Sequence, residues 1–429
     1  MSSDRSQALD PGKVVGLNVR RLRTLAGLGV RALASRARIS AAYVSALEGG
    51  RISDVPLERV GRLASALGAD AEGLTDREAV LRATREKVRG GEQLRREGCF
   101  QPALQLLDEA LDVYEATDDR AGAAEAYVKL GDVYREMAAG GDERYRGQAR
   151  SFYRRAYERI EPAMSSHPSM RERSAFALAS LALSRTYLYE SGMEPEAHRL
   201  LSEAKSVWEE ISRDPDRTLE CPDVDSYLSV CYRLLGRLAE NSGDPSTAET
   251  LYSKALEVTE QGGNRRAYAR AMLSLAELAL TMALTVNGEE GAGKFAEAAE
   301  RARQTKKVST ITDENFLWGE MVLIRAGIAT GELDEAAIRE RVVDLMRLAR
   351  GFHPAAVLEL AKKLREALSQ ARDHMPFGVI WDLSSLIQNH IVEAETAIRR
   401  EGEYQLRVSS GTSPSEVRVT EEETTAAKS

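Results

Sequence analysis

Residues 28–51 read LGVRALASRARISAAYVSALEGGR, which has the spacing of two short helices joined by a tight turn. Leu33, Ala34 and Ala37 give the first helix an apolar face, and Val44 and Leu47 give one to the second. Apolar residues that recur at helical spacing predict a face that is buried in a core. The stretch therefore predicts a helix-turn-helix motif.

The turn of this motif falls on Arg38-Ile39-Ser40. Ile39 fits the angle between the helices, and the Ser40 hydroxyl is suited to accept hydrogen bonds from the free N–H groups that begin the next helix. Apolar faces on two flanking helices are expected to complete the core: Val15, Val19 and Leu22 upstream, and Leu57, Val60, Ala64 and Leu67 downstream. Such a domain places the helix of residues 40–48 in the major groove of DNA.

The same residues resemble the DNA-binding domain of the Xre/Cro-type family of phage and bacterial regulators. The resemblance covers residues 14–74 and is carried by Leu33-Ala34, Ile39-Ser40, Val44-Ser45, Leu47-Glu48, Gly50 and Arg51. It implies a structural ion pair between Arg23 and Glu48, and base-facing positions at Ala41, Ala42, Ser45 and Ala46. This chain departs from the family at Gly29-Val30, where a phosphate-binding glutamine is common.

The charge of this domain favours phosphate contacts over base reading. Alanine can touch a thymine methyl, but it cannot make the bidentate hydrogen bonds, worth roughly 1–3 kcal/mol each, that discriminate bases strongly. Residues 13–63 hold ten basic and three acidic residues, a net charge of +7 in a chain whose formal net charge is -8. Such a concentration of positive charge indicates polyanion binding, unless the motif is a degenerate one kept only for docking. We predict DNA contacts at Arg31, Arg38, Ser40, Ala41, Ala42, Tyr43, Ser45, Ala46 and Arg51.

An internal repeat follows the first domain. One spacing recurs four times: Gly98, Ala103 and Ala110; Gly192, Ala197 and Ala204; Gly243, Ala248 and Ala255; and Gly331, Ala336 and Val343. Glycine permits a tight reversal, the alanines let helices approach, and Leu107, Leu201 or Tyr252 fills the gap between them. The pattern resembles the tetratricopeptide repeat. Its best copy begins at Leu235-Gly236, and a second copy with an insertion contains Gly131, Tyr153 and Ala156.

The expected fold is all-α, with an N-terminal helix-turn-helix domain and a tetratricopeptide-like α-solenoid. Thr75-Asp76-Arg77-Glu78 has capping-box spacing, so a helix should start near Asp76 without a flexible linker. About six helix pairs should run from Glu78 to about Ala349, followed by helices near 354–371 and 377–400, the last of which seals the array or joins a dimer interface. The expected parts are a disordered N-terminus (1–12), the DNA-binding domain (13–75), the repeat domain with its capping helices (76–400) and a disordered tail (401–429).

A repeat array of this kind offers a long concave surface. Arg233, Arg237 and Asn241 lie on successive turns of one helix, and they suit an extended ligand with an acidic side chain or a free C-terminal carboxylate. The alternative to a ligand-binding role is that the charged residues form solvated helix faces and that Trp318 lies in the core. The repeat register places the following residues on the concave side: Asp132, Arg135, Tyr189, Arg233, Arg237, Asn241, Arg270, Glu277, Trp318, Met321 and Arg325.

The combination of the two domains resembles the peptide-pheromone-sensing regulators of Gram-positive bacteria, the RRNPP group. The resemblance implies a homodimer that binds double-stranded DNA, with a regulatory peptide in the concave groove that controls operator binding. A DNA-binding adaptor whose repeats recruit a protein partner, and a scaffold that does not bind DNA, are the alternatives. An enzyme is the least favoured class.

Composition narrows the remaining possibilities. We see no secretory leader and no apolar run of ~18 residues, which predicts a cytoplasmic protein without a membrane partner. Cys99, Cys221 and Cys231 have no metal-binding spacing, and each is expected to be buried. The five histidines are scattered, so no metal and no cofactor are expected. Residues 288–294 loosely resemble a phosphate-binding loop, but they lack its spacing and are expected to form a solvated loop.

Overall fold

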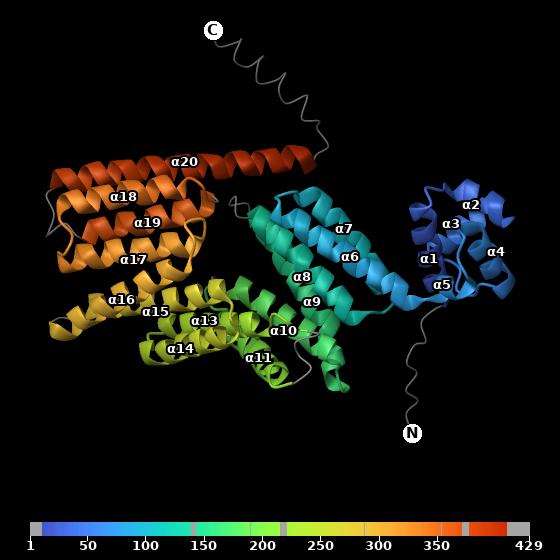
Figure 1. Ribbon diagram of the computed structural model, residues 1–429, viewed down its shortest axis with the longest axis horizontal. Helices are drawn as coiled ribbons and strands as arrows, with labels where there is room; N and C mark the ends of the chain where they lie inside the picture. Colours follow the sequence, from blue (N-terminus) through green and yellow to red (C-terminus); the bar gives the residue numbers. More distant parts are fainter. Residues whose placement is uncertain are drawn as a thin grey trace, which may run out of the picture. The chain divides into compact units, whose positions relative to one another are not determined.

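The computed structural model describes residues 11–138, 143–188, 190–214, 221–286, 288–352, 354–370 and 377–409, and all regular structure within them is helical (Figure 1). The chain divides into two compact units, Met1–Tyr134 with Gln148–Ala179 and Arg135–Gly147 with Ser180–Ser429. The predicted segments at 1–10 and 410–429 lie outside the described residues.

Five helices form the N-terminal domain: α1 (Pro11–Leu25), α2 (Val30–Ala37), α3 (Ala41–Glu48), α4 (Leu57–Leu67) and α5 (Ala71–Thr75). Val19, Leu33, Val44 and Leu47 are fully buried in one core, with Ile39 packed against it, so the predicted apolar faces are confirmed. One residue of that prediction is wrong: Leu57 is 85% exposed. It is the first residue of α4 and lies before the turn of the helix that reaches the core.

The junction between α5 and α6 (Arg77–Arg96) has no linker, as predicted, because Asp76 ends one helix and caps the next. The Ala79 N–H donates to Asp76 Oδ1 at 3.1 Å, so the cap is Asp76 and not Thr75. The Thr75 hydroxyl donates instead to the Glu72 carbonyl. Asn18 of α1 is fully buried and donates to the carbonyls of Leu74 and Asp76 at 3.1 and 2.9 Å. This one amide ties the N-terminal domain to the start of the first repeat.

Six helix pairs follow, in agreement with the prediction (Figure 1). They are α6 with α7 (Phe100–Ala116), α8 (Arg120–Met137) with α9 (Glu143–Ile160), α10 (Met170–Tyr187) with α11 (Glu194–Ser212), α13 (Val224–Asn241) with α14 (Pro245–Gln261), α15 (Arg265–Thr285) with α16 (Glu289–Val308), and α17 (Glu314–Thr330) with α18 (Glu335–Ala349). A short 3₁₀ helix, Glu161–Ser165, follows α9, and the last two helices are α19 (Pro354–Gln370) and α20 (Phe377–Ser409).

In three of the helix pairs, the large residue packs directly over a glycine of the partner helix. A Cβ atom on Gly236 of α13 would lie 2.6 Å from the Tyr252 ring of α14, and one on Gly91 would lie 2.8 Å from the Leu107 side chain. Gly131 faces the Tyr153 ring in the same way. Because the glycines have no side chain, the large residues are buried and the paired helices approach closely.

The turn glycines and small residues of the first three copies also match the prediction. Gly98, Gly192 and Gly243 have φ values of 76°, 85° and 79°, a backbone region that favours glycine. The six alanines of these copies are fully buried: Ala103, Ala110, Ala197, Ala204, Ala248 and Ala255. In the fourth copy, the predicted burial of Ala336 is wrong, because this residue is exposed. Its helix α18 begins four residues after Gly331, whereas α14 begins two residues after Gly243, so α18 buries a different face.

The C-terminal helix closes the array. Leu383, Ile387 and Ile391 of α20 are buried in the core shared with α17–α19, while Trp381 and Val392 are 65% and 51% exposed. The helix continues to Ser409, beyond the predicted start of the tail at residue 401.

Three further expectations are corrected. Cys99 is exposed, because it lies in the turn between Gly98 and α7, while Cys221 and Cys231 are buried. Residues 289–294 are not a loop, since they form the first turns of α16, where Glu289 and Glu290 favour a helix start. The sequence was also expected to contain no long apolar segment, but α15 is long and apolar enough to cross a membrane. Of its apolar stretch, 56% is buried within the protein, as in the core helix of a repeat domain.

We predict that Gly236→Ala destabilises the protein by about 1–3 kcal/mol, because the added methyl overlaps the Tyr252 ring. The matched control is Gly147→Ala in α9, where nothing lies within 4 Å of the new Cβ. That control should stabilise by about 0.5–1 kcal/mol, since alanine is the better helix former. Urea unfolding of both variants measures the difference, and equal effects would contradict the packing described.

Candidate nucleic-acid interface and ligand groove

The start of α3 is set by Ser40, the residue directly before the helix. The Tyr43 N–H donates to the Ser40 Oγ at 3.1 Å, which confirms the predicted cap. The preceding helix α2 ends at Arg38, whose φ of 54° lies in the left-handed region. The chain therefore turns sharply between α2 and α3, and the start of α3 is presented at the surface.

The far end of α3 is held by the predicted ion pair. The Arg23 guanidinium donates to both carboxylate oxygens of Glu48 at 2.7 and 2.9 Å, and to the Leu28 carbonyl at 2.7 Å. The hydrogen bond to Glu48 raises the pKa of Arg23. The side chains are only 16% and 9% exposed, so this pair fixes α1, α3 and the α1–α2 loop in place and offers little to a ligand.

Several predicted DNA contacts lie on the surface around α3. Ala42 and Ser45 are exposed, whereas Ala41 and Ala46 are half-buried. In the N-terminal domain, six exposed basic residues make no ion pair with any residue the structure describes: Arg20, Arg31, Arg36, Arg38, Arg51 and Arg59. By contrast, Arg62 pairs with Glu58 at 2.5 Å. The unpaired side chains are the ones available to phosphates.

Tyr43 does not belong to this surface. The Arg59 guanidinium lies 4.4 Å from the centre of its ring, and the ring packs against the core of the domain. Its hydroxyl is buried and makes no hydrogen bond to a described residue. We therefore leave Tyr43 out of the proposed DNA contacts, because a buried hydroxyl cannot meet a base or phosphate.

In the second unit, the first helices of successive pairs form a continuous layer. Helix α13 contacts α15, α15 contacts α17, and α17 contacts α19. Burial and the charges of Arg270 and Arg237 together lower the pKa of Arg233 to about 10. Arg185 of α10, which the sequence prediction missed, acts on Arg233 as well.

Other predicted groove residues are occupied within the protein. Trp318 is buried in the core, with the Lys363 ammonium 4.9 Å from its ring centre, and Met321 is fully buried. Lys363 also pairs with Glu277 at 3.5 Å. Trp318 therefore occupies a core position, which was the alternative to a groove position. Neither Trp318 nor Met321 exposes enough of its side chain to contact a ligand.

The remaining predicted residues are dispersed. Asn241 lines a cleft of about 460 Å³ with His198 and Asp244, and Arg325 lines one of about 440 Å³ with Phe295 and Ile328. Asp132 accepts a hydrogen bond from the Tyr153 hydroxyl at 2.8 Å. Arg135 is exposed, and Tyr189 lies outside the described residues.

Two residues that position these surfaces were missed by sequence reasoning. Asn18 holds the α5–α6 junction, yet a single asparagine on a helix carries no distinctive pattern. Arg185 lies on α10, which has no glycine from which its repeat register can be read. One signal could have identified Arg185. Helix α10 comes before the turn at Gly192 just as α13, which carries Arg233, comes before the turn at Gly243.

Comparison with known families supports the N-terminal assignment. Residues 15–77 match the family described as "Helix-turn-helix domain". A sequence comparison with curated proteins gives no match.

Solved structures resemble the chain over longer stretches. The apo form of RapI has a TM-score of 0.51 at 12% identity and covers 74% of this chain and 99% of its own. A Rap protein complexed with competence and sporulation factor has a TM-score of 0.48 at 12% identity, covering 91% and 99%. The apo form of ComR from S. thermophilus has a TM-score of 0.32 at 15% identity, covering 69% and 96%. At these identities the RapI likeness shows the fold alone.

The fold and the comparisons together define the class. The chain is an all-helical protein with an N-terminal helix-turn-helix domain, a DNA-binding fold, followed by stacked helix pairs like those of tetratricopeptide solenoids. Its helix-turn-helix domain resembles the Xre/Cro type in the Ser40 cap and in the Arg23–Glu48 pair.

The backbone of Arg38 lies in the left-handed region, which should lower the stability of the turn between α2 and α3. A residue with a Cβ atom in this region costs roughly 1–2 kcal/mol more than glycine. Arg38→Gly should therefore stabilise α2 and α3 by about 1 kcal/mol, whereas Arg38→Ala, which keeps the Cβ, should not. Hydrogen exchange of the α2 and α3 amides measures the effect, and equal protection in both variants would count against the strained turn.

Proposed function

We propose that this chain is a cytoplasmic, DNA-binding transcription regulator that works as a homodimer. Residues 13–75 bind the operator, and the repeat domain of residues 76–400 binds a regulatory peptide that controls this binding. The protein acts by binding and not by catalysis. The observation that carries the proposal is the Ser40-capped helix of the helix-turn-helix domain, which is flanked by unpaired arginines.

The DNA-binding surface combines α3 with the basic residues around it. Phosphate contacts from Arg31, Arg38 and Arg51 position the domain, while Ala42 and Ser45 approach the base edges. Alanine discriminates bases weakly, so the shape of the operator and the pairing of two domains supply the remaining specificity. A homodimer on two half-sites spaced by whole helical turns, ~10 base pairs or a multiple, meets this need.

Replacing both Arg31 and Arg51 with alanine should weaken binding to duplexes of unrelated sequence alike. Each lost phosphate contact lowers the slope of log affinity against log salt by about 0.9, so the double variant should lose about two units of slope. Gel shifts over a salt series measure both effects. Arg347→Ala, at an exposed arginine of α18 that pairs with Asp344, is the control and should change neither. An unchanged slope in the double variant would remove these residues from the interface.

The dimer has a candidate interface on α20. Trp381 and Val392 are exposed on one face of this helix, eleven residues and about 16 Å apart along its axis. Exposed large apolar side chains on one helix face favour association between copies.

Changing both Trp381 and Val392 to aspartate should convert the dimer to a monomer that keeps its helical content, since both side chains are exposed. Analytical ultracentrifugation gives the oligomeric state. Ile311→Asp, at a residue that is 54% exposed in the turn before α17, serves as the control. A double variant that stays dimeric, or a parent that is a monomer on footprinted DNA, would contradict this interface or the dimer itself.

The same exposed face of α20 favours a second candidate, an adaptor that recruits a folded protein partner. The two functions differ in what the purified protein carries and in what changes DNA binding. Native mass spectrometry that releases a short peptide supports the regulator, and a bound peptide that shifts the DNA affinity supports control. A stable complex with a globular protein and no effect of peptides on DNA binding would support the adaptor.

A further inference from the structure

A cleft of about 740 Å³ lies between the N-terminal domain and the first helix pair, within one compact unit of the chain. Its lining comes from α1, the end of α3, α6 and α7. Helix α1 contacts α6, α6 contacts α7, and the buried Asn18 of α1 donates to the carbonyls of Leu74 and Asp76 at the start of α6. The cleft is thus framed by packed helices, and it shares no residue with the predicted peptide groove.

The floor of the cleft is apolar. Six apolar side chains line it, two from each helix: Leu17 and Leu25 of α1, Val80 and Ala83 of α6, and Val113 and Ala116 of α7. Leu25 is 76% exposed, so part of this apolar lining lies in water. Covering it with an apolar molecule is favourable, because apolar surface is removed from water.

Two of the three carboxylates in the lining are already neutralised. Glu109 accepts a hydrogen bond from the Lys87 ammonium at 2.6 Å, and Glu48 is the partner of Arg23. The third, Asp112, is exposed. The acidic groups therefore leave one free negative charge at the cleft.

The wall formed by α1 carries more free positive charge than this. Lys13 and Arg20 make no ion pair with any residue the structure describes. Arg21 donates to the neutral Asn18 Oδ1 at 3.3 and 3.2 Å and, within the described part of the chain, to no carboxylate. Lys13 is half-buried, and its Cγ lies 3.7 Å from the position of a Cβ atom on Gly50. Three cations thus line the cleft without a carboxylate partner.

We propose that this cleft binds a small organic anion, whose apolar body packs on Leu17, Val80 and Val113 while its acidic group meets Lys13 and Arg20. Ammonium and guanidinium groups make their strongest hydrogen bonds with anionic oxygens. Small-molecule sites commonly have volumes of about 300–1,000 Å³, an apolar lining and a few polar groups, and the cleft has each of these features.

The site goes beyond the proposed function, because it assigns a second ligand to another part of the chain and does not depend on peptide binding. Its walls belong to the helix-turn-helix domain on one side and to the first helix pair on the other. A bound anion would therefore contact both.

The first test uses two fluorescent probes with the same aromatic rings in titrations of the full-length protein. Anilinonaphthalene sulfonate carries one negative charge, and phenylnaphthylamine carries none. Replacing both Lys13 and Arg20 with methionine should weaken sulfonate binding at least about tenfold, because a charged hydrogen bond is lost, and should leave binding of the neutral probe unchanged.

The matched control is Arg82→Met. Arg82 is an exposed arginine of α6 that does not line the cleft, and it makes no ion pair with a described residue. This variant should bind both probes as the parent does. Unchanged sulfonate binding in the double methionine variant, or an equal loss of both probes, would overturn the recognition of an anion.

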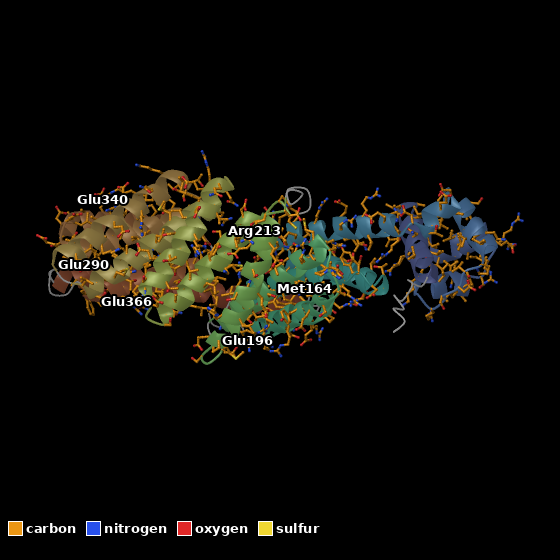
Figure 2. All side chains as sticks on the ribbon, turned by 90° about the horizontal axis from the view of Figure 1, so that it is seen from below. Met164, Glu196, Arg213, Glu290, Glu340 and Glu366 are labelled. Atoms are coloured by element: carbon orange, nitrogen blue, oxygen red, sulfur yellow. The ribbon has the colours of Figure 1, made fainter. Side chains whose placement is uncertain are left out.

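The second test fills the cleft. Ala83→Phe places a ring over the apolar floor, so each chain should bind one molecule fewer of either probe than the parent. Ala336→Phe in α18 is the control, because Ala336 is exposed and lies one helical turn before Glu340, whose side chain is at the surface in Figure 2. An equal number of bound probes in the parent and in Ala83→Phe, or the same loss in Ala336→Phe, would overturn the site.

Inorganic sulfate separates an organic anion from a bare ion. At the concentration of the sulfonate probe, sulfate should not displace it, since sulfate has no apolar body to cover the floor. Complete displacement of the probe by sulfate at that concentration would show a simple anion site and would overturn the proposed class of ligand.

Discussion

The packing of a large side chain over a glycine is the contact on which the repeat array depends. Tyr252 lies over Gly236, Tyr153 over Gly131 and Leu107 over Gly91, in three separate helix pairs. Each contact lets the two helices of a pair approach closely and buries alanines on both sides of the large residue. Helices α13, α15, α17 and α19 then lie against one another in sequence, so the layer that carries Arg233 and Arg270 is a product of this packing.

The features that the sequence predicted well are those that depend on short-range spacing. The Ser40 cap, and the buried Ala248 and Ala255 on either side of Tyr252, are set by residues a few positions apart on one helix. The Arg23–Glu48 pair joins two helices, and it was implied by the family resemblance. The features that sequence reasoning missed depend on where an element begins or on what covers it. Leu57 is exposed because α4 starts there, and Ala336 is exposed because α18 starts later after its glycine than α14 does. Tyr43 has the right position for a DNA contact, but Arg59 and the domain core enclose it.

Charge is distributed in this protein according to what each surface meets. The helix-turn-helix domain holds a net charge of +7 between residues 13 and 63, although the whole chain is acidic. Within the repeats, many charges are neutralised locally: Glu320 of α17 pairs with both Lys306 and Arg341. By contrast, Arg31, Arg38 and Arg51 around α3 make no ion pair with any residue the structure describes.

The buried Asn18 amide has a mechanical consequence. Its two hydrogen bonds hold the last turn of α5 and the cap of α6 against α1, and Asp76 leaves no free residue between the two helices. No linker residue between α5 and α6 is therefore available to absorb a rotation of α6. A movement of α6 is therefore expected to displace α1 as well, because Asn18 of α1 is hydrogen-bonded to the residue that caps α6.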